Sequence, residues 1–282
     1  MLSADGVPDS AEGQEALRRL AEEAARAGGN VARQRYDTLP TVRLKADRSE
    51  VSEADQAAQQ AVLACLAAQR PDDAVIAEEQ QDAASALPEP DNERVCWVVD
   101  PIDGTRNYVR HIPLYACSVA AMWQGYPLVG AVYDPVRDVL YSASRTGGLF
   151  VNGARHEARP AAFDARRTLN PKPVVAIPSS PTGPWAAVAH DWLDAFVCRS
   201  LGATALHLAL VATGELNGML ADNPRLWDVA AGWLLITAAG GRITTPNGEP
   251  LFPRDVQTCV PDEFPTLAGD RVHYSTLLAH CR

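Results

Sequence analysis

The chain has 282 residues, of which 47% are hydrophobic and 21% charged, so it can bury a large core as one domain or as two packed halves. Its formal net charge of −10, with no cluster of Lys and Arg, argues against nucleic acid or an anionic membrane surface as a partner. Scattered cysteines without metal-like spacing, an acidic N-terminus that does not resemble a signal peptide, and no apolar run of about 20 residues predict a cytoplasmic protein.

The first half of the chain predicts helices followed by strands. Residues 11–27 carry apolar side chains at helical spacing, and Gly28-Gly29 should end this helix. A second helix should begin at Ser52, whose spacing to Asp55 is that of a capping box. Apolar strands are expected at residues 74–77 and 95–99, and residues 116–152 have the pattern of an antiparallel meander with tight turns.

Beyond about residue 160 the pattern alternates between strands and helices. Helices are expected at residues 184–195, 203–213 and 227–239, with short apolar strands between them. The predicted fold class is therefore α/β (α+β), with an antiparallel meander sheet followed by a mixed α/β half. We expect two parts, an N-terminal α+β half at residues 1–160 and a C-terminal α/β half at residues 161–282.

The segment WVVDPIDGT, residues 97–105, places two aspartates at the end of a buried strand. Pro101 interrupts the regular ladder, so the chain can turn and direct the carboxylates of Asp100 and Asp103 to one point. Carboxylates that close repel one another unless one is protonated or a cation lies between them. A hard divalent cation such as Mg²⁺ satisfies this arrangement, although the two residues could also merely cap a turn.

Other acidic residues stand at comparable positions. Glu78 ends the strand at residues 74–77, and Asp228 begins an apolar helix. Asp228 can equally be explained as a helix N-terminal acid, and Asp55 as part of the capping box. The set nevertheless predicts that acidic side chains gather at strand ends and helix starts, where sheet proteins collect active-site ligands.

Three segments in this order, AEE, WVVDPIDGTRNYV and WDVAAGWLLITAAGG, resemble the inositol monophosphatase family of Mg²⁺-dependent phosphomonoesterases. The resemblance covers nearly the whole chain, from the first helix to beyond Gly241. It implies a five-layer αβαβα sandwich of the inositol monophosphatase and fructose-1,6-bisphosphatase type, usually a homodimer and often sensitive to lithium. It also implies two or three Mg²⁺ ions per site and a small phosphorylated metabolite as the substrate.

The resemblance assigns roles to residues of this chain. The implied metal ligands are Glu78, Asp100, Ile102 through its carbonyl oxygen, Asp103 and Asp228. The implied catalytic residues are Glu78, Thr105 and Asp55, which would position and deprotonate the attacking water. The implied substrate-binding residues are Gly104, Thr105, Gly202, Thr204, Asp222 and Lys45, the last of which could equally be a solvated surface lysine.

The substrate stays open because the chain departs from the family pattern. Ala221 stands where inositol phosphatases commonly have a glutamate, and the adjacent Asp222 would point to the opposite face of a strand. Inositol 1-phosphate is our first choice, with histidinol phosphate, fructose 1,6-bisphosphate and 3′-phosphoadenosine-type nucleotides as alternatives. In-line attack by water without a phospho-enzyme is expected. A catalytically weak, metal-binding regulatory protein is the alternative from another functional class.

Overall fold

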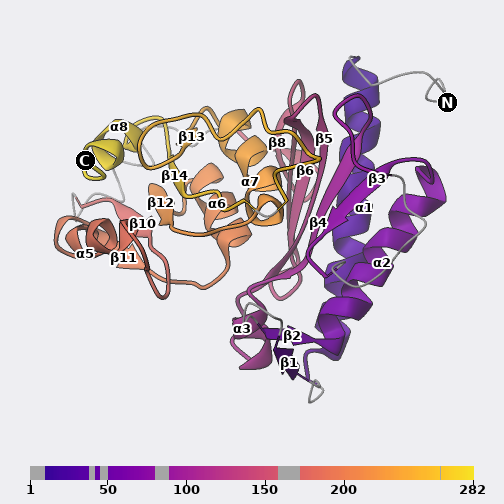
Figure 1. Ribbon diagram of the computed structural model, residues 1–282, viewed down its shortest axis with the longest axis horizontal. Coiled ribbons are helices and arrows are strands. Elements are labelled where there is room, and N and C mark those ends of the chain that lie inside the picture. The colour runs from indigo at the N-terminus through magenta and orange to yellow at the C-terminus, as the bar shows by residue number, and fades with distance from the viewer. Residues whose placement is uncertain (1–9, 38–41, 45–49, 80–88, 158–171, 261) are drawn as a thin grey trace.

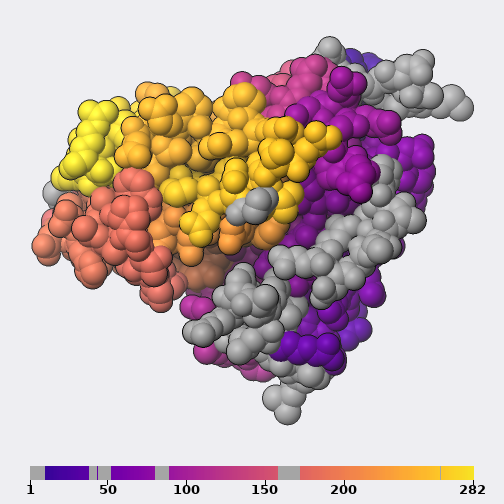
Figure 2. Space-filling view, in the orientation of Figure 1, coloured from indigo at the N-terminus to yellow at the C-terminus, as the bar shows by residue number. Residues whose placement is uncertain are grey.

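A computed structural model describes residues 10–37, 42–44, 50–79, 89–157, 172–260 and 262–282 of the chain. Its helices and strands form five layers that alternate between helices and sheets (Figure 1). This arrangement confirms the predicted sandwich. On the face shown in Figure 2, the N-terminal half of the chain and the orange-to-yellow C-terminal half cover separate sides of the surface.

The first two layers come from the N-terminal half. Helices α1 (Ala11–Arg35) and α2 (Glu53–Gln69) pack on one face of a seven-stranded sheet in the order β3-β4-β5-β6-β7-β8-β9. The pair β3–β4 is parallel and every other neighbouring pair is antiparallel, as the meander predicted. The strands are β3 (Ala74–Ala77), β4 (Cys96–Asp103), β5 (Ala116–Trp123), β6 (Tyr126–Asp134), β7 (Val139–Ser144), β8 (Gly148–Val151) and β9 (Ala154–Arg155).

The middle layer consists of two apolar helices, α6 (Thr204–Ala212) and α7 (Leu226–Ala238). Most residues of both helices are buried, because the seven-stranded sheet covers one side of the layer and a second sheet covers the other. A helix that is apolar on all sides is expected to be enclosed in this way.

The second sheet and the outer helices complete the five layers. The sheet has the order β11-β10-β12-β14-β13, with parallel pairs at β10–β11 and β10–β12 and antiparallel pairs at β12–β14 and β13–β14. Helices α5 (Trp185–Ala195) and α8 (Tyr274–Ala279) cover its outer face. The strands are β10 (Val174–Ala176), β11 (Val197–Arg199), β12 (Gly218–Ala221), β13 (Arg242–Thr244) and β14 (Thr266–Gly269).

Short elements lie at one end of the first sheet. Strands β1 (Val42–Leu44) and β2 (Glu50–Ser52) form an antiparallel pair, and α3 (Thr105–Val109) follows β4 directly. Together with β14 and α8, the β1–β2 pair was not anticipated from the sequence. No helix in the described parts of the chain combines the length and apolar character needed to cross a membrane.

The predicted end of the first helix at Gly28-Gly29 is wrong, because α1 continues to Arg35. Both glycines are buried where the helix meets α2 and the sheet. A Cβ atom at Gly28 would lie 2.6 Å from Cγ2 of Val62, and one at Gly29 would lie 2.5 Å from Cδ1 of Tyr133. The glycines therefore allow close packing within the helix and do not terminate it.

Candidate active site

Three aspartates form a compact group at the junction of β4 and α7. Asp100 and Asp103 come from the end of β4, and Asp228 comes from the first turn of α7. Each offers one carboxylate oxygen, and these oxygens all lie within 4.8 Å of one another. We call these three residues the acidic cluster.

The local geometry of β4 explains how two of these side chains converge. The pairing of β4 with β5 is regular from Cys96 to Asp100 and shifts before Asp103 pairs with Ala116. Within this irregular stretch Oδ1 of Asp100 accepts the N–H of Ile102 at 3.0 Å. Such a bulge changes the direction of successive side chains, so the prediction that the ladder is interrupted at Pro101 is confirmed.

Burial sets the protonation of the acidic cluster. It raises the pKa of Asp103 to about 8 and that of Asp228 to about 6, with further contributions from the charges of Asp228 and Glu78 respectively. Burial, followed by the charges of Glu78, Asp228 and Asp103, also raises the pKa of Asp100 well above its ordinary range. Without a cation the site therefore favours protonated carboxyl groups.

Two helix N-termini partly offset this repulsion. Asp103 accepts the N–H of Thr204 at 3.0 Å and that of Ala205 at 2.8 Å, so its carboxylate lies at the start of α6. Asp228 accepts the N–H of Arg225 at 2.6 Å at the start of its own helix. The positive end of a helix dipole stabilises an ionised carboxylate in both positions. Asp228 is thus a helix-capping acid and a member of the acidic cluster at the same time.

Asp55 and Thr105 form a second, adjoining pair. The hydroxyl of Thr105 lies 3.1 Å from Oδ1 of Asp55 and 3.0 Å from the carbonyl oxygen of Ile102, two acceptors for its proton. The other oxygen of Asp55 accepts the N–H of Ser52 at 2.7 Å and its hydroxyl at 2.6 Å, so the predicted capping box is also present. Burial, chiefly, raises the pKa of Asp55 to about 6.

Glu78 joins the same region from β3. Its N–H donates to the carbonyl oxygen of Val99 at 3.1 Å, which continues the parallel pairing of β3 with β4 beyond Ala77. Its negative charge is among the causes that raise the pKa values of Asp55, Asp100 and Asp228. The structure therefore brings together the predicted acidic residues from β3, β4, α2 and α7.

Of the predicted substrate-binding residues, Gly104, Gly202 and Thr204 lie together beside the acidic cluster. Gly104 has a φ of +95°, and a Cβ there would lie 3.2 Å from the carbonyl oxygen of Gly202. Thr204 follows at the start of α6 and donates its N–H to Asp103. Two loops distant in sequence thus meet at positions that require glycine.

Thr105 pairs with Asp55, and the last two predicted substrate contacts, Asp222 and Lys45, have different outcomes. Oδ2 of Asp222 accepts the N–H of Thr182 at 2.8 Å and its hydroxyl at 3.1 Å. That carboxylate oxygen is therefore used to hold the loop after β10. Lys45 lies outside the described residues.

A group of hydrogen bonds that the sequence analysis missed holds the Gly202 loop in place. Leu201 donates its N–H to Nε2 of His207 at 3.1 Å. The carbonyl oxygen of Leu201 accepts a hydrogen bond from Nδ2 of Asn107 at 2.7 Å. The same amide nitrogen of Asn107 donates to the carbonyl oxygen of Leu114 at 2.7 Å. Because burial lowers the pKa of His207 to about 4, its imidazole is neutral at pH 7 and can accept this bond. We call His207, Leu201 and Asn107 the loop clamp.

The donor set of the site suits a divalent, oxygen-seeking cation. It offers several closely spaced carboxylates and contains no imidazole or thiolate in the acidic cluster. Mg²⁺ and Ca²⁺ prefer such hard oxygen ligands. A divalent ion would also remove the repulsion that raises the carboxyl pKa values, so the residues present fit the metal that the sequence predicted.

Comparison with known proteins identifies similar chains. Residues 14–279 match the inositol monophosphatase family, which confirms the resemblance found in the sequence. Nus factor SuhB of Pasteurella multocida is 32% identical over 269 residues, covering 87% of this chain and 97% of that protein. Inositol-1-monophosphatase of Mesorhizobium japonicum is 33% identical over 213 residues, covering 73% of this chain and 76% of that protein.

Solved structures agree with these relatives. The crystal structure of the extragenic suppressor protein SuhB from Bartonella henselae has a TM-score of 0.79 and 29% identity, covering 95% of this chain and 98% of that one. An IMPase/NADP phosphatase crystallised with Mg²⁺ and phosphate has a TM-score of 0.75 and 25% identity, covering 95% of both chains.

The electrostatics of the acidic cluster predict how metal and pH change stability. Raised carboxyl pKa values stabilise the folded state below about pH 4, and this contribution is lost as the pH rises through about 6 and 8. The metal-free protein should therefore melt at a lower temperature at pH 8 than at pH 5. Mg²⁺ at about 100 times its Kd at pH 8 should restore about 2.7 kcal/mol at that pH, and the same concentration should restore less at pH 5.

Asp100→Asn tests the same electrostatics by removing one ionisable carboxyl group from the acidic cluster while keeping an acceptor for the N–H of Ile102. It should raise the melting temperature of the metal-free protein at pH 8 and abolish its response to Mg²⁺, as measured by calorimetry with and without EDTA. Asp191→Asn, on the exposed side of α5, is the control and should change neither. A lower metal-free melting temperature for Asp100→Asn would contradict the repulsion.

The loop clamp predicts a local effect of His207. His207→Leu removes the acceptor of the Leu201 N–H and should cost about 1–3 kcal/mol, because a lost partner leaves a donor unsatisfied. Hydrogen exchange at Leu201 and Gly202 should accelerate at least about tenfold. His207→Gln places an acceptor at a similar position and should retain slow exchange. Equal exchange in wild type and His207→Leu would show that the bond does not hold the loop.

Proposed function

This chain belongs to the inositol monophosphatase family, and we propose that it hydrolyses phosphate monoesters with the help of divalent metal ions. The observation that supports this proposal is the placement of the acidic cluster beside the Asp55–Thr105 pair. A metal site alone could be structural, but a buried carboxylate paired with a hydroxyl next to it also provides a route for a proton. Mg²⁺ is the proposed ion, because its oxygen preference matches these ligands.

The proposed ligands are the side chains of Glu78, Asp100, Asp103 and Asp228, with the carbonyl oxygen of Ile102. When bound, divalent ions would neutralise the charge of the phosphate oxygens and strengthen water as a nucleophile. The protein supplies the fixed positions of these ligands. Backbone N–H groups hold the carboxylates of Asp103 and Asp228 in place before any ion arrives, so little rearrangement is needed.

Thr105 and Asp55 are proposed to orient the attacking water and take its proton. The Thr105 hydroxyl has two acceptors, so its proton is directed into the protein and a lone pair remains for an incoming water. The pKa of about 6 for Asp55 suits a group that accepts a proton near neutral pH. Direct attack by water on phosphorus then needs no covalent phospho-enzyme.

Gly104 and the start of α3 are proposed to hold the phosphate. The left-handed conformation of Gly104 turns the chain from β4 into α3 immediately after Asp103. The first N–H groups of a helix have no acceptor within that helix. The amides of Gly104 and Thr105 are therefore proposed as donors to phosphate oxygens at the edge of the acidic cluster.

Inositol 1-phosphate is the proposed substrate, with the related phosphate esters as alternatives. The relative from Mesorhizobium japonicum, named an inositol-1-monophosphatase, supports the first choice. The structure crystallised as an IMPase/NADP phosphatase supports a broader range. Ala221 offers no hydrogen bond to a substrate hydroxyl, and Oδ2 of Asp222 is bound to Thr182. Loss of such a contact to a polyol changes preference by about tenfold or more.

A regulatory role is the second candidate, because several relatives are named as Nus factors. The SuhB protein of Pasteurella multocida matches 87% of this chain. A protein with that role could use the acidic cluster only to bind cations. The two functions are distinguished by turnover.

The first test is phosphate release from inositol 1-phosphate, histidinol phosphate, fructose 1,6-bisphosphate and adenosine 3′,5′-bisphosphate. We expect release with Mg²⁺, none with excess EDTA, and a single preferred compound. Asp100→Asn should retain less than about a tenth of the wild-type rate, because it removes a central metal ligand. Folded, Mg²⁺-saturated protein that releases no phosphate from any of the four compounds would instead favour the regulatory role.

The second test separates the proton route from metal binding. Thr105→Val keeps the shape of the side chain but removes its hydroxyl, so kcat should fall about 100-fold or more. KM and the stabilisation by Mg²⁺ should change little. Thr105→Ser retains the hydroxyl and is the matched control, expected within about tenfold of wild type. Unchanged kcat in Thr105→Val would exclude a role for this hydroxyl in orienting water.

A further inference from the structure

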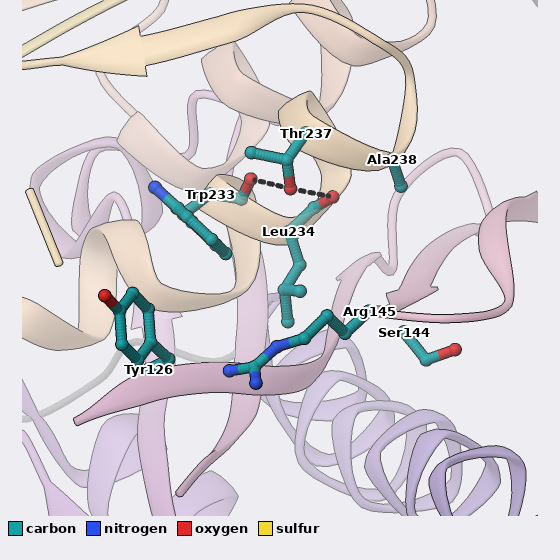
Figure 3. Close-up of a pocket in the computed structure, with 7 residues that line it drawn as sticks. All are labelled: Tyr126, Ser144, Arg145, Trp233, Leu234, Thr237 and Ala238. Carbon is teal, nitrogen blue, oxygen red and sulfur yellow. Dashed lines mark hydrogen bonds between the residues drawn. The ribbon is translucent and has the colours of Figure 1, made fainter. Parts of the chain in front are cut away.

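A cavity of about 380 Å³ lies between the seven-stranded sheet and the C-terminal half of α7 (Figure 3). Its walls come from the start of β6, the end of β7 with the residue that follows, and the last turns of α7. The residues that line it are Tyr126, Ser144, Arg145, Trp233, Leu234, Thr237 and Ala238. We call this cavity the aromatic pocket.

The aromatic pocket is separate from the acidic cluster. Tyr126 on β6 pairs with Trp123, the last residue of β5. The residue before Trp123, Met122, pairs with Cys96, which is the first residue of β4. The pocket therefore lies at the end of the sheet where β4 begins. Asp103 is the last residue of the same strand, so the eight residues of β4, about 25 Å of extended chain, separate the two ends of the sheet. Along α7 the pocket begins at Trp233, more than one turn beyond Asp228.

Most of the pocket wall is apolar. The indole of Trp233 packs edge-on against Phe252, with ring centroids 5.6 Å apart, and remains half-buried. Leu234 points from α7 toward the side of the pocket where Arg145 lies. The hydroxyl of Ser144 accepts the N–H of Gly147 at 2.9 Å, and that of Thr237 bonds back to its own helix. The proton of the Thr237 hydroxyl is therefore directed to its own helix, and the Ser144 hydroxyl is held at the turn that follows β7.

Arg145 is the charged residue among the described residues that line the pocket. The guanidinium of Arg145 lies 5.4 Å from the centre of the Tyr126 ring and donates to the carbonyl oxygen of Pro127 at 3.2 Å, contacts that hold it at the pocket wall. Among the described residues, neither the Tyr126 hydroxyl nor the Trp233 N–H makes a side-chain hydrogen bond. The part of the chain that the structure describes contributes no Asp or Glu to the lining of the cavity.

We propose that the aromatic pocket binds a flat aromatic anion, such as an aromatic carboxylate. The rings of Trp233 and Tyr126 would pack against the ligand ring, and Arg145 would pair with its carboxylate. A volume of about 380 Å³ accommodates a molecule of two fused rings, and an apolar lining with few convergent polar groups is typical of small-molecule sites. This inference does not depend on the proposed phosphatase activity.

Three probes with one ring system test the proposal by isothermal titration calorimetry: indole-3-acetate, indole-3-acetamide and tryptamine. The anion should bind at least about tenfold more tightly than the neutral amide, and the cation most weakly. Arg145→Gln should remove the preference for the anion. Trp233→Leu should weaken the binding of indole-3-acetate and of indole-3-acetamide equally, by about tenfold or more.

The controls assign the binding to this pocket. Asp100→Asn and excess EDTA should leave the affinity for indole-3-acetate unchanged, because the acidic cluster lies at the other end of β4. If Trp233→Leu does not fold, Tyr126→Leu takes its place, with a melting curve recorded for each variant. The proposal would be overturned by any of three results. These are no binding of indole-3-acetate at millimolar concentration, binding of tryptamine as tight as that of indole-3-acetate, and wild-type affinity of Arg145→Gln for indole-3-acetate.

Discussion

The mutual repulsion of buried carboxylates is the constraint on which the site depends. Asp100, Asp103 and Asp228 place oxygens within 4.8 Å of one another, and the first two are buried while Asp228 is partly buried. Ionised groups in such a position are unfavourable unless protons, backbone dipoles or a cation compensate them. The structure supplies the dipoles at the starts of α6 and α7 and leaves the rest of the compensation to protons or to a metal ion.

The five-layer architecture is what permits this arrangement. Helices α6 and α7 lie between two sheets. Their N-termini, which are partly exposed, are directed at the end of β4. The hydroxyl of Ser118 on β5 donates to the carbonyl oxygen of Trp227 at 3.2 Å and ties the sheet to the start of α7. The apolar core thus determines the positions of the charged groups, and the charged groups contribute function at some cost in stability.

The proposed proton transfer and the positioning of the nearby loop involve different residues. Asp55 uses one oxygen to cap α2 and the other to bond Thr105, so a single carboxylate fixes a helix start and takes part in the site. In the described hydrogen bonds, His207 and Asn107 contact neither Asp100 nor Asp228. His207 accepts the N–H of Leu201, and Asn107 donates to the carbonyl oxygen of Leu201. The loop beside the acidic cluster is therefore held by residues that are not members of the cluster.

Local sequence was sufficient to identify much of this protein. The strand that ends in Asp100 and Asp103, the Ser52–Asp55 cap, the meander and the alternating second half follow from spacing and periodicity, which act over a few residues. Tertiary structure alone decided that Gly28-Gly29 lies inside a helix, because the reason is contact with Val62 and Tyr133. It also decided that His207 holds Leu201, that Asp222 binds Thr182 and that Tyr126 meets Trp233 across a cavity. These pairings depend on how whole layers pack, and no short stretch of sequence encodes them.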